Sequence, residues 1–236
     1  MPSKRASSEL ALEDWLTDIL RCPRDRLTLA VAADGLVCPD GHAYPVYEGI
    51  PIFLLSEDFP YHPRFNKLTR EDIARLADSD DGTTPPPSEI HPFVREFLQG
   101  SNGRLYRRIR DSIDHYPIPA LRLPAANGET FLDVGCHWGR WAVAAARTGY
   151  RVAAIDPNFE ALVVARRVCR QLGVEAAFLC ADARYLPFAD GGFDVVHSYF
   201  SAATSGQTAG EDRNQGGGPR RACNDADSDG KLFWRS

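Results

Sequence analysis

The segment from Phe131 to Trp141 constrains the fold of this chain more than any other part of the sequence. It opens with the apolar residues of a buried strand, and two glycines, Gly135 and Gly139, follow within a short turn. Gly135 allows the chain to turn without a Cβ clash, and Gly139 allows a helix start to lie close to a ligand or a strand. A helix is expected directly after the turn and ends at Gly149. We therefore expect a strand, a tight turn and a helix that presents its free N–H groups at the turn.

The strand-and-helix alternation continues beyond this segment, and an acidic residue lies near the end of each of the first three strands. Strands are expected over residues 131–134, 150–156, 175–180 and 193–199, with a helix over residues 159–172. Asp133 stands two residues before Gly135, Asp156 ends the second strand, and Asp182 follows the third. Because the carboxyl ends of parallel strands meet at one edge of a sheet, the three acids are expected there. The pattern predicts an α/β fold with a doubly wound sheet and a ligand site at that edge.

The three acids allow more than one interpretation. Asp133 could accept a hydrogen bond from the ammonium group of a ligand or from a backbone amide. Asp156 lies 23 residues beyond Asp133. In a doubly wound sheet, a carboxylate at about this spacing can accept from both hydroxyls of a ribose. Alternatively, all three acids are turn and cap residues of an ordinary α/β domain. A nicotinamide-dependent oxidoreductase is a further interpretation, but it prefers a G-x-G-x-x-G turn, and this turn reads Gly135-Cys-His-Trp-Gly139.

The same residues resemble the class I S-adenosylmethionine-dependent methyltransferases, and specifically their type 11 group. The matching motifs are Leu132-Asp-Val-Gly-Cys-His-Trp-Gly139, Ala154-Ile-Asp-Pro157, Ala181-Asp-Ala183 and Phe193-Asp-Val-Val196. His137 departs from the family pattern, because a glycine usually occupies the middle of the first motif. The resemblance implies a Rossmann-like sheet and S-adenosyl-L-methionine as the cofactor.

The resemblance also implies roles for individual residues. Gly135, Cys136 and Gly139 would flank the methionine part of the cofactor, Asp156 would hold the ribose, and Asp182 with Ala183 would hold the adenine. With Asp133, the expected cofactor-binding residues are Asp133, Gly135, Cys136, Gly139, Asp156, Asp182 and Ala183. The segment from Gly103 to Tyr106 resembles a stretch that often precedes this fold and could cover the cofactor. The candidate polar groups near the methyl acceptor are His137, His197, Ser198 and Tyr199, of which His197 and Tyr199 could equally be core side chains; the catalytic residue and the acceptor stay unknown.

A small α+β module is expected before this domain, over residues 8–55. Residues 13–55 resemble the Trm112-like domain, through Cys22-Pro-Arg-Asp25, Cys38-Pro-Asp-Gly41 and the apolar segment that follows. That family often binds zinc with two C-P-x-C knuckles, but Asp25 and Gly41 replace two of the cysteines here. His42 and Asp25 could replace the missing ligands, yet structural zinc sites prefer closed sets of cysteine and histidine. We expect a metal-free module that docks on its own catalytic domain or on a protein partner.

The rest of the chain divides into a linker, the methyltransferase segment and a tail. The linker is expected over residues 56–90, the methyltransferase domain over residues 91–200, and a disordered tail over residues 201–236. The tail is polar where the family expects a helix and three strands, and a reading-frame shift near Ser201 would explain the change. The sheet is then incomplete after its fourth strand, which becomes an exposed apolar edge. The alternative function is accordingly a non-catalytic cofactor-binding or partner-docking protein.

Composition limits the classes of partner and the compartment. The net charge is −5 and the pI about 5.7, whereas proteins that grip nucleic acid usually carry a basic surface. The six cysteines are scattered and do not form the framework of a small secreted domain. No apolar segment is long enough to span a membrane. We expect a cytoplasmic protein that has no membrane anchor and does not bind nucleic acid in bulk.

Overall fold

A five-stranded sheet lies at the centre of the computed structural model, which describes residues 12–33, 35–47, 49–55, 85–101, 114–198 and 232–235. The strands follow the order β7-β6-β5-β8-β9. Their bounds are β5 Thr130–Val134, β6 Arg151–Asp156, β7 Ala177–Cys180, β8 Val195–Ser198 and β9 Leu232–Arg235. The first four strands run parallel, and β5 lies between β6 and β8. The parallel Rossmann-like core predicted from the sequence is therefore confirmed.

The fourth strand of this core has a neighbour that the sequence did not suggest. β9 runs antiparallel to β8 and pairs Leu232 with Ser198 and Arg235 with Val195. The composition of the tail predicted an exposed outer edge for the fourth strand, but β9 covers this edge in the structure. Tyr199 and residues 200–231, which include the site of the suggested frame shift, lie outside the described residues.

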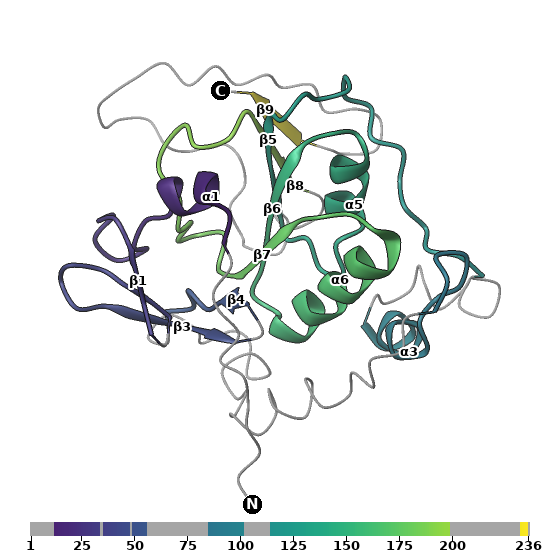
Figure 1. Ribbon diagram of the computed structural model, residues 1–236, viewed down its shortest axis with the longest axis horizontal. Helices are drawn as coiled ribbons and strands as arrows, with labels where there is room; N and C mark the ends of the chain where they lie inside the picture. The colour runs from purple at the N-terminus through teal and green to yellow at the C-terminus, as the bar shows by residue number, and fades with distance from the viewer. Residues whose placement is uncertain are drawn as a thin grey trace, which may run out of the picture.

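Two helices cover one face of the sheet, as Figure 1 shows on the right of the strands. They are α5, Arg140–Arg147, and α6, Phe159–Leu172. Both follow strands of the core, and their apolar residues join those of the sheet in one hydrophobic core. The sheet contributes Phe131, Val152, Ala154, Phe178 and Val195 to this core. These residues alternate along their strands, as expected for side chains that point to the same face.

The N-terminal module covers the opposite face of the sheet, on the left in Figure 1. The module consists of the helix α1, Asp14–Ile19, and an antiparallel sheet in the order β1-β2-β3-β4. The strands are β1 Ala30–Ala32, β2 Gly35–Val37, β3 Ala43–Tyr47 and β4 Ile50–Pro51. Gly35 is required in β2 because a Cβ atom there would lie 2.2 Å from the carbonyl oxygen of Tyr44. The predicted small α+β module therefore forms, in the shape of an antiparallel sheet with one short helix.

Hydrophobic and backbone contacts join the module to the parallel sheet. Leu16, Leu20 and Phe53 of the module are almost fully buried in a second core, together with Leu132, Val134, Ala153, Ile155 and Leu179 of the sheet. The amide of Phe53 donates to the carbonyl oxygen of Cys180 at 2.7 Å, at the outer edge of β7. Both faces of the parallel sheet and its β7 edge are thus covered, which explains why its strands are apolar on both sides.

A further helix, α3, Pro92–Ser101, lies beside α6. The guanidinium of Arg167 in α6 lies 4.4 Å from the ring centre of Phe93. Gln171 of α6 accepts from the hydroxyl of Tyr116 at 2.6 Å and donates to the carbonyl oxygens of Pro86 and Glu89. These bonds hold the segment before α3 against the core. Most of the predicted linker and the whole segment 103–106 lie outside the described residues.

None of the helices in the described part of the chain is long and apolar enough to cross a membrane.

Candidate cofactor site

The turn between β5 and α5 is built from residues with left-handed backbone conformations. Gly135 has φ 75° and Gly139 has φ 80°, a region that glycine adopts without steric cost. The amides of Gly135 and Cys136 donate to the carbonyl oxygen of Ile155 at 2.8 and 3.0 Å, which ties the turn to β6. A Cβ atom on Gly139 would lie 3.0 Å from Cβ of Ala165 and 3.4 Å from the ring of Phe178. Gly139 therefore allows the start of α5 to pack against α6 and β7.

His137 occupies the middle of this turn with φ 50°, a conformation that few non-glycine residues adopt. This strain gives a physical reason for the glycine that the family pattern usually has at this position. The imidazole packs against Phe97 of α3 with ring centres 5.2 Å apart. Burial, assisted by the charge of Arg140, lowers the pKa of His137 to about 4, so the ring is neutral near pH 7. Its Nδ1 atom is buried and has no hydrogen-bond partner among the described residues.

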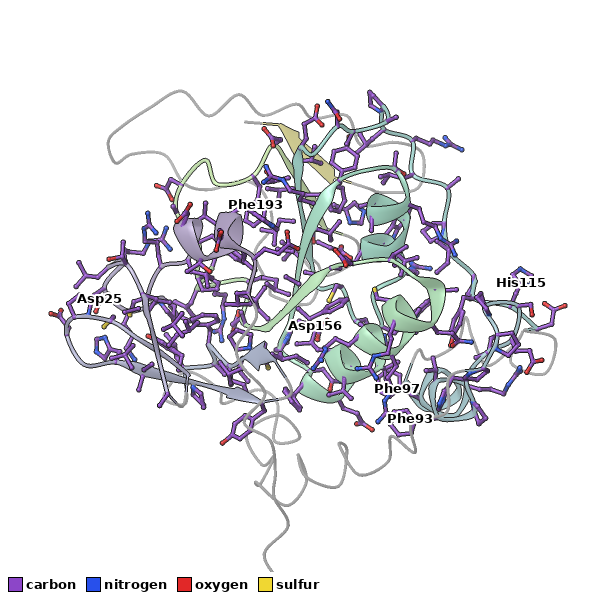
Figure 2. All side chains as sticks on the ribbon, viewed as in Figure 1. Asp25, Phe93, Phe97, His115, Asp156 and Phe193 are labelled. Atoms are coloured by element: carbon purple, nitrogen blue, oxygen red, sulfur yellow. The ribbon has the colours of Figure 1, made fainter. Side chains whose placement is uncertain are left out.

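Asp156 ends β6 and joins two turns at the carboxyl edge of the sheet, where Figure 2 labels it. Its Oδ2 accepts from the amide of His137 at 2.9 Å, and its Oδ1 accepts from the amide of Asn158 at 2.8 Å. Burial raises the pKa of Asp156 to about 6, although the two backbone hydrogen bonds oppose the rise. The amide of Ala181 donates to the carbonyl oxygen of Asp156 at 3.3 Å, so the end of β7 lies beside it.

Asp133 forms a buried pair with His197 across the neighbouring strands β5 and β8. Its Oδ1 lies 2.9 Å from Nδ1 of His197, and the two residues are 1% and 0% exposed. The His197 ring also packs against Phe131 and Trp141, at ring-centre distances of 5.8 and 4.9 Å. The sequence left open whether His197 lies near the methyl acceptor or in the core, and in the structure its side chain lies in the core. The other carboxylate oxygen of Asp133, Oδ2, is buried and has no hydrogen-bond partner among the described residues.

Asp182 follows β7 in a turn that it shares with Arg184. Its Oδ1 accepts from the amide of Arg184 at 2.8 Å, and its Oδ2 accepts from Nη2 of the same residue at 2.6 Å. Ala183 between them is exposed. The Cys136 thiol is buried, and burial with the nearby charges of Asp156 and Asp133 raises its pKa well above the ordinary value. The neutral thiol belongs to the hydrophobic core that the sheet shares with α5 and α6.

The structure gathers the sequence-predicted residues at one edge of the sheet. Asp133, Gly135, Cys136, Gly139 and Asp156 surround the turn between β5 and α5, and Asp182 follows the next strand outward. Two contributors were not named from the sequence. Asn158 caps α6 with its side chain and holds Asp156 with its amide, and Trp141 packs on His197. The Asn158 cap could have been found, because asparagine directly before a predicted helix is a favoured N-cap.

The amino-acid sequence of this region matches a known family. Residues 131–209 match the family described as a methyltransferase domain. The match begins within β5 and includes the glycine turn, Asp156 and Asp182. No curated protein sequence matches the chain.

Three solved structures resemble parts of the chain. The tRNA (uracil-54, C5)-methyltransferase of Pyrococcus abyssi, in complex with S-adenosyl-L-homocysteine, is 23% identical over 31% of this chain and 25% of that chain, with a TM-score of 0.27. The PH0226 protein of Pyrococcus horikoshii OT3 is 22% identical over 45% of this chain and 50% of that one, with a TM-score of 0.30. The plantazolicin methyltransferase BpumL, in complex with a triazolic desmethylPZN analog and SAH, is 21% identical over 54% and 41%, with a TM-score of 0.25.

The chain spans half or less of the length of each of these three proteins. The family match extends from β5 past the fourth parallel strand and contains the glycine turn between β5 and α5. The sequence from residue 131 to residue 209 is therefore similar to a methyltransferase domain.

Proposed function

We propose that this chain binds S-adenosylmethionine at the carboxyl edge of its parallel sheet and acts as a methyltransferase on an acceptor that is not identified. The observation that carries the proposal is the buried Oδ2 atom of Asp133, which has no hydrogen-bond partner among the described residues. A buried carboxylate oxygen without a partner is costly, so its retention beside the glycine turn supports a ligand that donates to it. The ammonium group of an amino acid is such a donor.

The remaining residues of the edge fit other parts of the cofactor. Asp156 accepts one backbone amide on each carboxylate oxygen and keeps a lone pair on each for the hydroxyls of a ribose. Asp182 would hold the adenine together with the exposed Ala183, and it would share its carboxylate with Arg184. The free Nδ1 of the neutral His137 is a further polar atom at the turn.

Charge also supports a cationic ligand at this edge. Asp133 and Asp156 are both nearly buried, and burial raises the pKa of Asp156 to about 6. A positive charge placed beside a buried acid favours its ionised form. S-adenosylmethionine carries such charges on its sulfonium and ammonium groups, so its binding would favour the ionised carboxylate of Asp156.

The chemistry that these residues support is positioning. S-adenosylmethionine, when bound, supplies an electrophilic methyl group for in-line displacement by a nucleophile. The chain contributes by holding the ribose and the amino-acid part in fixed positions, which lowers the entropic part of the barrier. His197 does not reach a solvent-facing position, because it is 0% exposed and hydrogen-bonded to Asp133. Tyr199, the other strand-end candidate, lies outside the described residues.

The burial of His197 favours a second candidate function, a protein that binds the cofactor without transferring its methyl group. Both functions share the same site and differ only in turnover. Incubation with methyl-labelled S-adenosylmethionine and the small-molecule, protein and RNA fractions of a cell extract separates them. Label in any fraction above a sample without the protein supports the transferase, and label in none supports the binding protein.

Calorimetric titration with S-adenosylhomocysteine tests the site itself. We expect wild-type protein to bind, and Asp133→Asn to bind about tenfold or more weakly, because the buried partner of the ammonium loses its charge. Asp14→Asn serves as the matched control, since Asp14 is exposed on α1 and far along the chain from the site. A folded wild type that does not bind, or an Asp133→Asn variant that binds as the control does, contradicts the proposal.

A further inference from the structure

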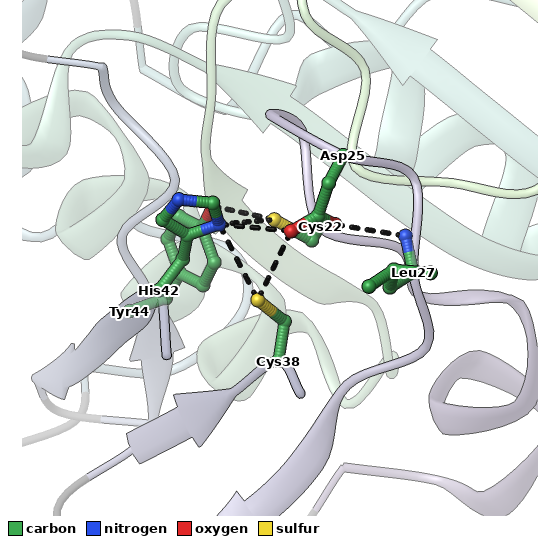
Figure 3. A network of polar contacts seen from close by, with 6 residues as sticks. All are labelled: Cys22, Asp25, Leu27, Cys38, His42 and Tyr44. Atoms are coloured by element: carbon green, nitrogen blue, oxygen red, sulfur yellow. Dashed lines mark hydrogen bonds and ion pairs between the residues drawn. The ribbon is translucent and has the colours of Figure 1, made fainter. Parts of the chain in front are cut away.

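Four potential metal ligands meet at one end of the N-terminal module, away from the cofactor site. Cys22 and Asp25 belong to the turn before β1, and Cys38 and His42 belong to the turn between β2 and β3. Figure 3 shows the four side chains pointing toward one another. Their ligand atoms all lie within 4.8 Å of each other, which the spacing of the residues in the sequence did not establish.

Four of the distances between these atoms are close to the edges of a tetrahedron around a zinc ion. Zinc bonds of about 2.0–2.3 Å give ligand-to-ligand distances of roughly 3.3–3.8 Å in a regular tetrahedron. Nδ1 of His42 lies 3.5 Å from Sγ of Cys22, 3.3 Å from Sγ of Cys38 and 2.9 Å from Oδ2 of Asp25. Sγ of Cys38 lies 3.2 Å from the same Asp25 oxygen. The two remaining distances, from Sγ of Cys22 to Asp25 and to Cys38, are within 4.8 Å.

The surroundings of the cluster suit a closed structural site. Cys22 and Cys38 are 0% and 3% exposed and are free thiols although they lie close together. The other carboxylate oxygen of Asp25 accepts from the amide of Leu27 at 2.9 Å, which fixes the orientation of the carboxylate. The hydroxyl of Tyr44 lies 2.9 Å from Sγ of Cys22. Such outer contacts orient the ligands of a metal ion and raise its affinity.

We propose that Cys22, Asp25, Cys38 and His42 bind one zinc ion. Two thiolates, an imidazole and a carboxylate provide four ligands of the types that zinc accepts, and soft thiolates disfavour magnesium and calcium. The sequence favoured a metal-free module because Asp25 and His42 interrupt the cysteine pattern. The structure places the ligand atoms of these two residues beside the two thiols. The proposal does not depend on methyltransferase activity.

The position of the cluster gives the ion a structural role in docking. The next residue after Asp25 is Arg26, whose guanidinium donates to the carbonyl oxygens of Leu186 and Phe188 at 2.7 and 2.6 Å. These two residues lie in the loop that follows Asp182. An ion that ties the 22–25 turn to the 38–42 turn holds Arg26 in place against this loop. Loss of the ion is therefore expected to weaken the contact between the module and the methyltransferase domain.

Metal analysis and cobalt substitution test the site. We expect the purified chain to hold one equivalent of zinc, and the chain reconstituted with Co²⁺ to show the visible absorption of a tetrahedral ion and the near-ultraviolet absorption of cobalt–thiolate bonds. Chelator should lower the melting temperature, and added zinc should restore it. Cys38→Ser removes one of the two thiolates and should weaken cobalt binding and lower the cobalt–thiolate absorption. Cys169→Ala is the matched control, because Cys169 is also a buried free cysteine but lies in α6.

A second variant keeps the test open if Cys38→Ser does not fold. Asp25→Asn retains the two thiols and the imidazole, and we expect it to bind zinc about tenfold or more weakly than wild type in competition with a chromogenic chelator. The proposal is overturned if the folded chain, grown with zinc, contains none and gives no cobalt spectrum. It is equally overturned if the variants at Cys38 and Asp25 bind metal as the Cys169→Ala control does.

Discussion

Replacement of Asp156 by asparagine should change how the stability of the unliganded protein depends on pH. Burial raises the pKa of Asp156 from 3.8 to about 6, so the folded chain resists ionisation of this acid. At about 1.4 kcal/mol for each pKa unit, the ionised carboxylate costs roughly 3 kcal/mol of stability once the pH is well above 6. The pKa of Asp156 is higher in the folded chain than in the unfolded chain. The contribution of this group to stability is therefore greatest below pH 4 and is lost as the pH rises through 6.

The asparagine variant removes this cost but introduces another. The amides of His137 and Asn158 each donate to one oxygen of Asp156, and the amide nitrogen of asparagine cannot accept from either. One hydrogen bond to a charged group is lost, which costs about 1.5–3 kcal/mol. The two effects nearly cancel at neutral pH, so wild type and variant should have similar unfolding free energies there. Near pH 4, where wild type is protonated and relieved of its charge, the variant should be the less stable by about 1–3 kcal/mol.

Urea unfolding of both proteins between pH 4 and 7.5 measures this difference, and the other acids cancel in the comparison. Calorimetry with S-adenosylhomocysteine at neutral pH tests the second role of the residue, since loss of the carboxylate should weaken binding by about 10- to 100-fold. That deficit should shrink below pH 6 as the wild-type carboxylate takes up its proton. A difference in unfolding free energy that does not vary with pH would refute the reasoning that Asp156 is a buried acid with a raised pKa.

Three further substitutions test the packing and hydrogen bonds around the site. Gly139→Ala should destabilise the protein by about 1–3 kcal/mol in urea unfolding, because the new Cβ lies 3.0 Å from Cβ of Ala165 and φ is 80°; an unchanged midpoint would contradict this. Asp194→Ala should cost about 1–3 kcal/mol, because Oδ2 accepts from both the amide and the hydroxyl of Thr130 at 2.7 and 2.8 Å. These bonds lower the pKa of Asp194. The contribution of Asp194 to stability should therefore be present above the usual pKa of an aspartate and disappear as acid protonates the carboxylate. The same pH dependence of stability in wild type and variant would refute this prediction. His197→Ala should cost about 1–3 kcal/mol and weaken S-adenosylhomocysteine binding, since it leaves a buried acid without its partner; unaltered stability and affinity would exclude a positioning role.

The sequence predicted the parallel core well because its features are local. Strand, glycine turn and helix occur in order along the chain, and the acids at strand ends identify the carboxyl edge. The same local reasoning identified Asp133, Asp156 and Asp182 but not their hydrogen bonds. Arg184 binds Asp182 from two residues away, which local spacing allows but does not require. The pair of Asp133 and His197 depends on the register between β5 and β8, which no single segment fixes.

The close approach of Cys22, Asp25, Cys38 and His42 and the fifth strand, β9, escaped prediction for a different reason. Both depend on contacts between segments that are distant in sequence. His42 meets Asp25 only because the strands between them fold back antiparallel, and this brings the turns on either side together. β9 pairs with β8 although the polar composition before it gave no strand pattern. Composition describes how much apolar surface a segment can bury. Strand pairing also satisfies the hydrogen bonds of backbone N–H and C=O groups, and every residue type except proline has both groups.

The way in which the two hydrophobic cores share the parallel sheet bears on what the N-terminal module is for. Leu132 and Ile155 point into the core with the module, while their neighbours Phe131 and Ala154 point into the core with α5 and α6. The strands that carry Asp133 and Asp156 are therefore packed on both faces. Without the module, the face that carries Leu132 and Ile155 would be exposed to water. That exposure would cost about 25 cal/mol of stability for each Å² of apolar surface. The module consequently acts as a structural layer of the methyltransferase domain, and any ion that orders the module also stabilises the strands that carry Asp133 and Asp156.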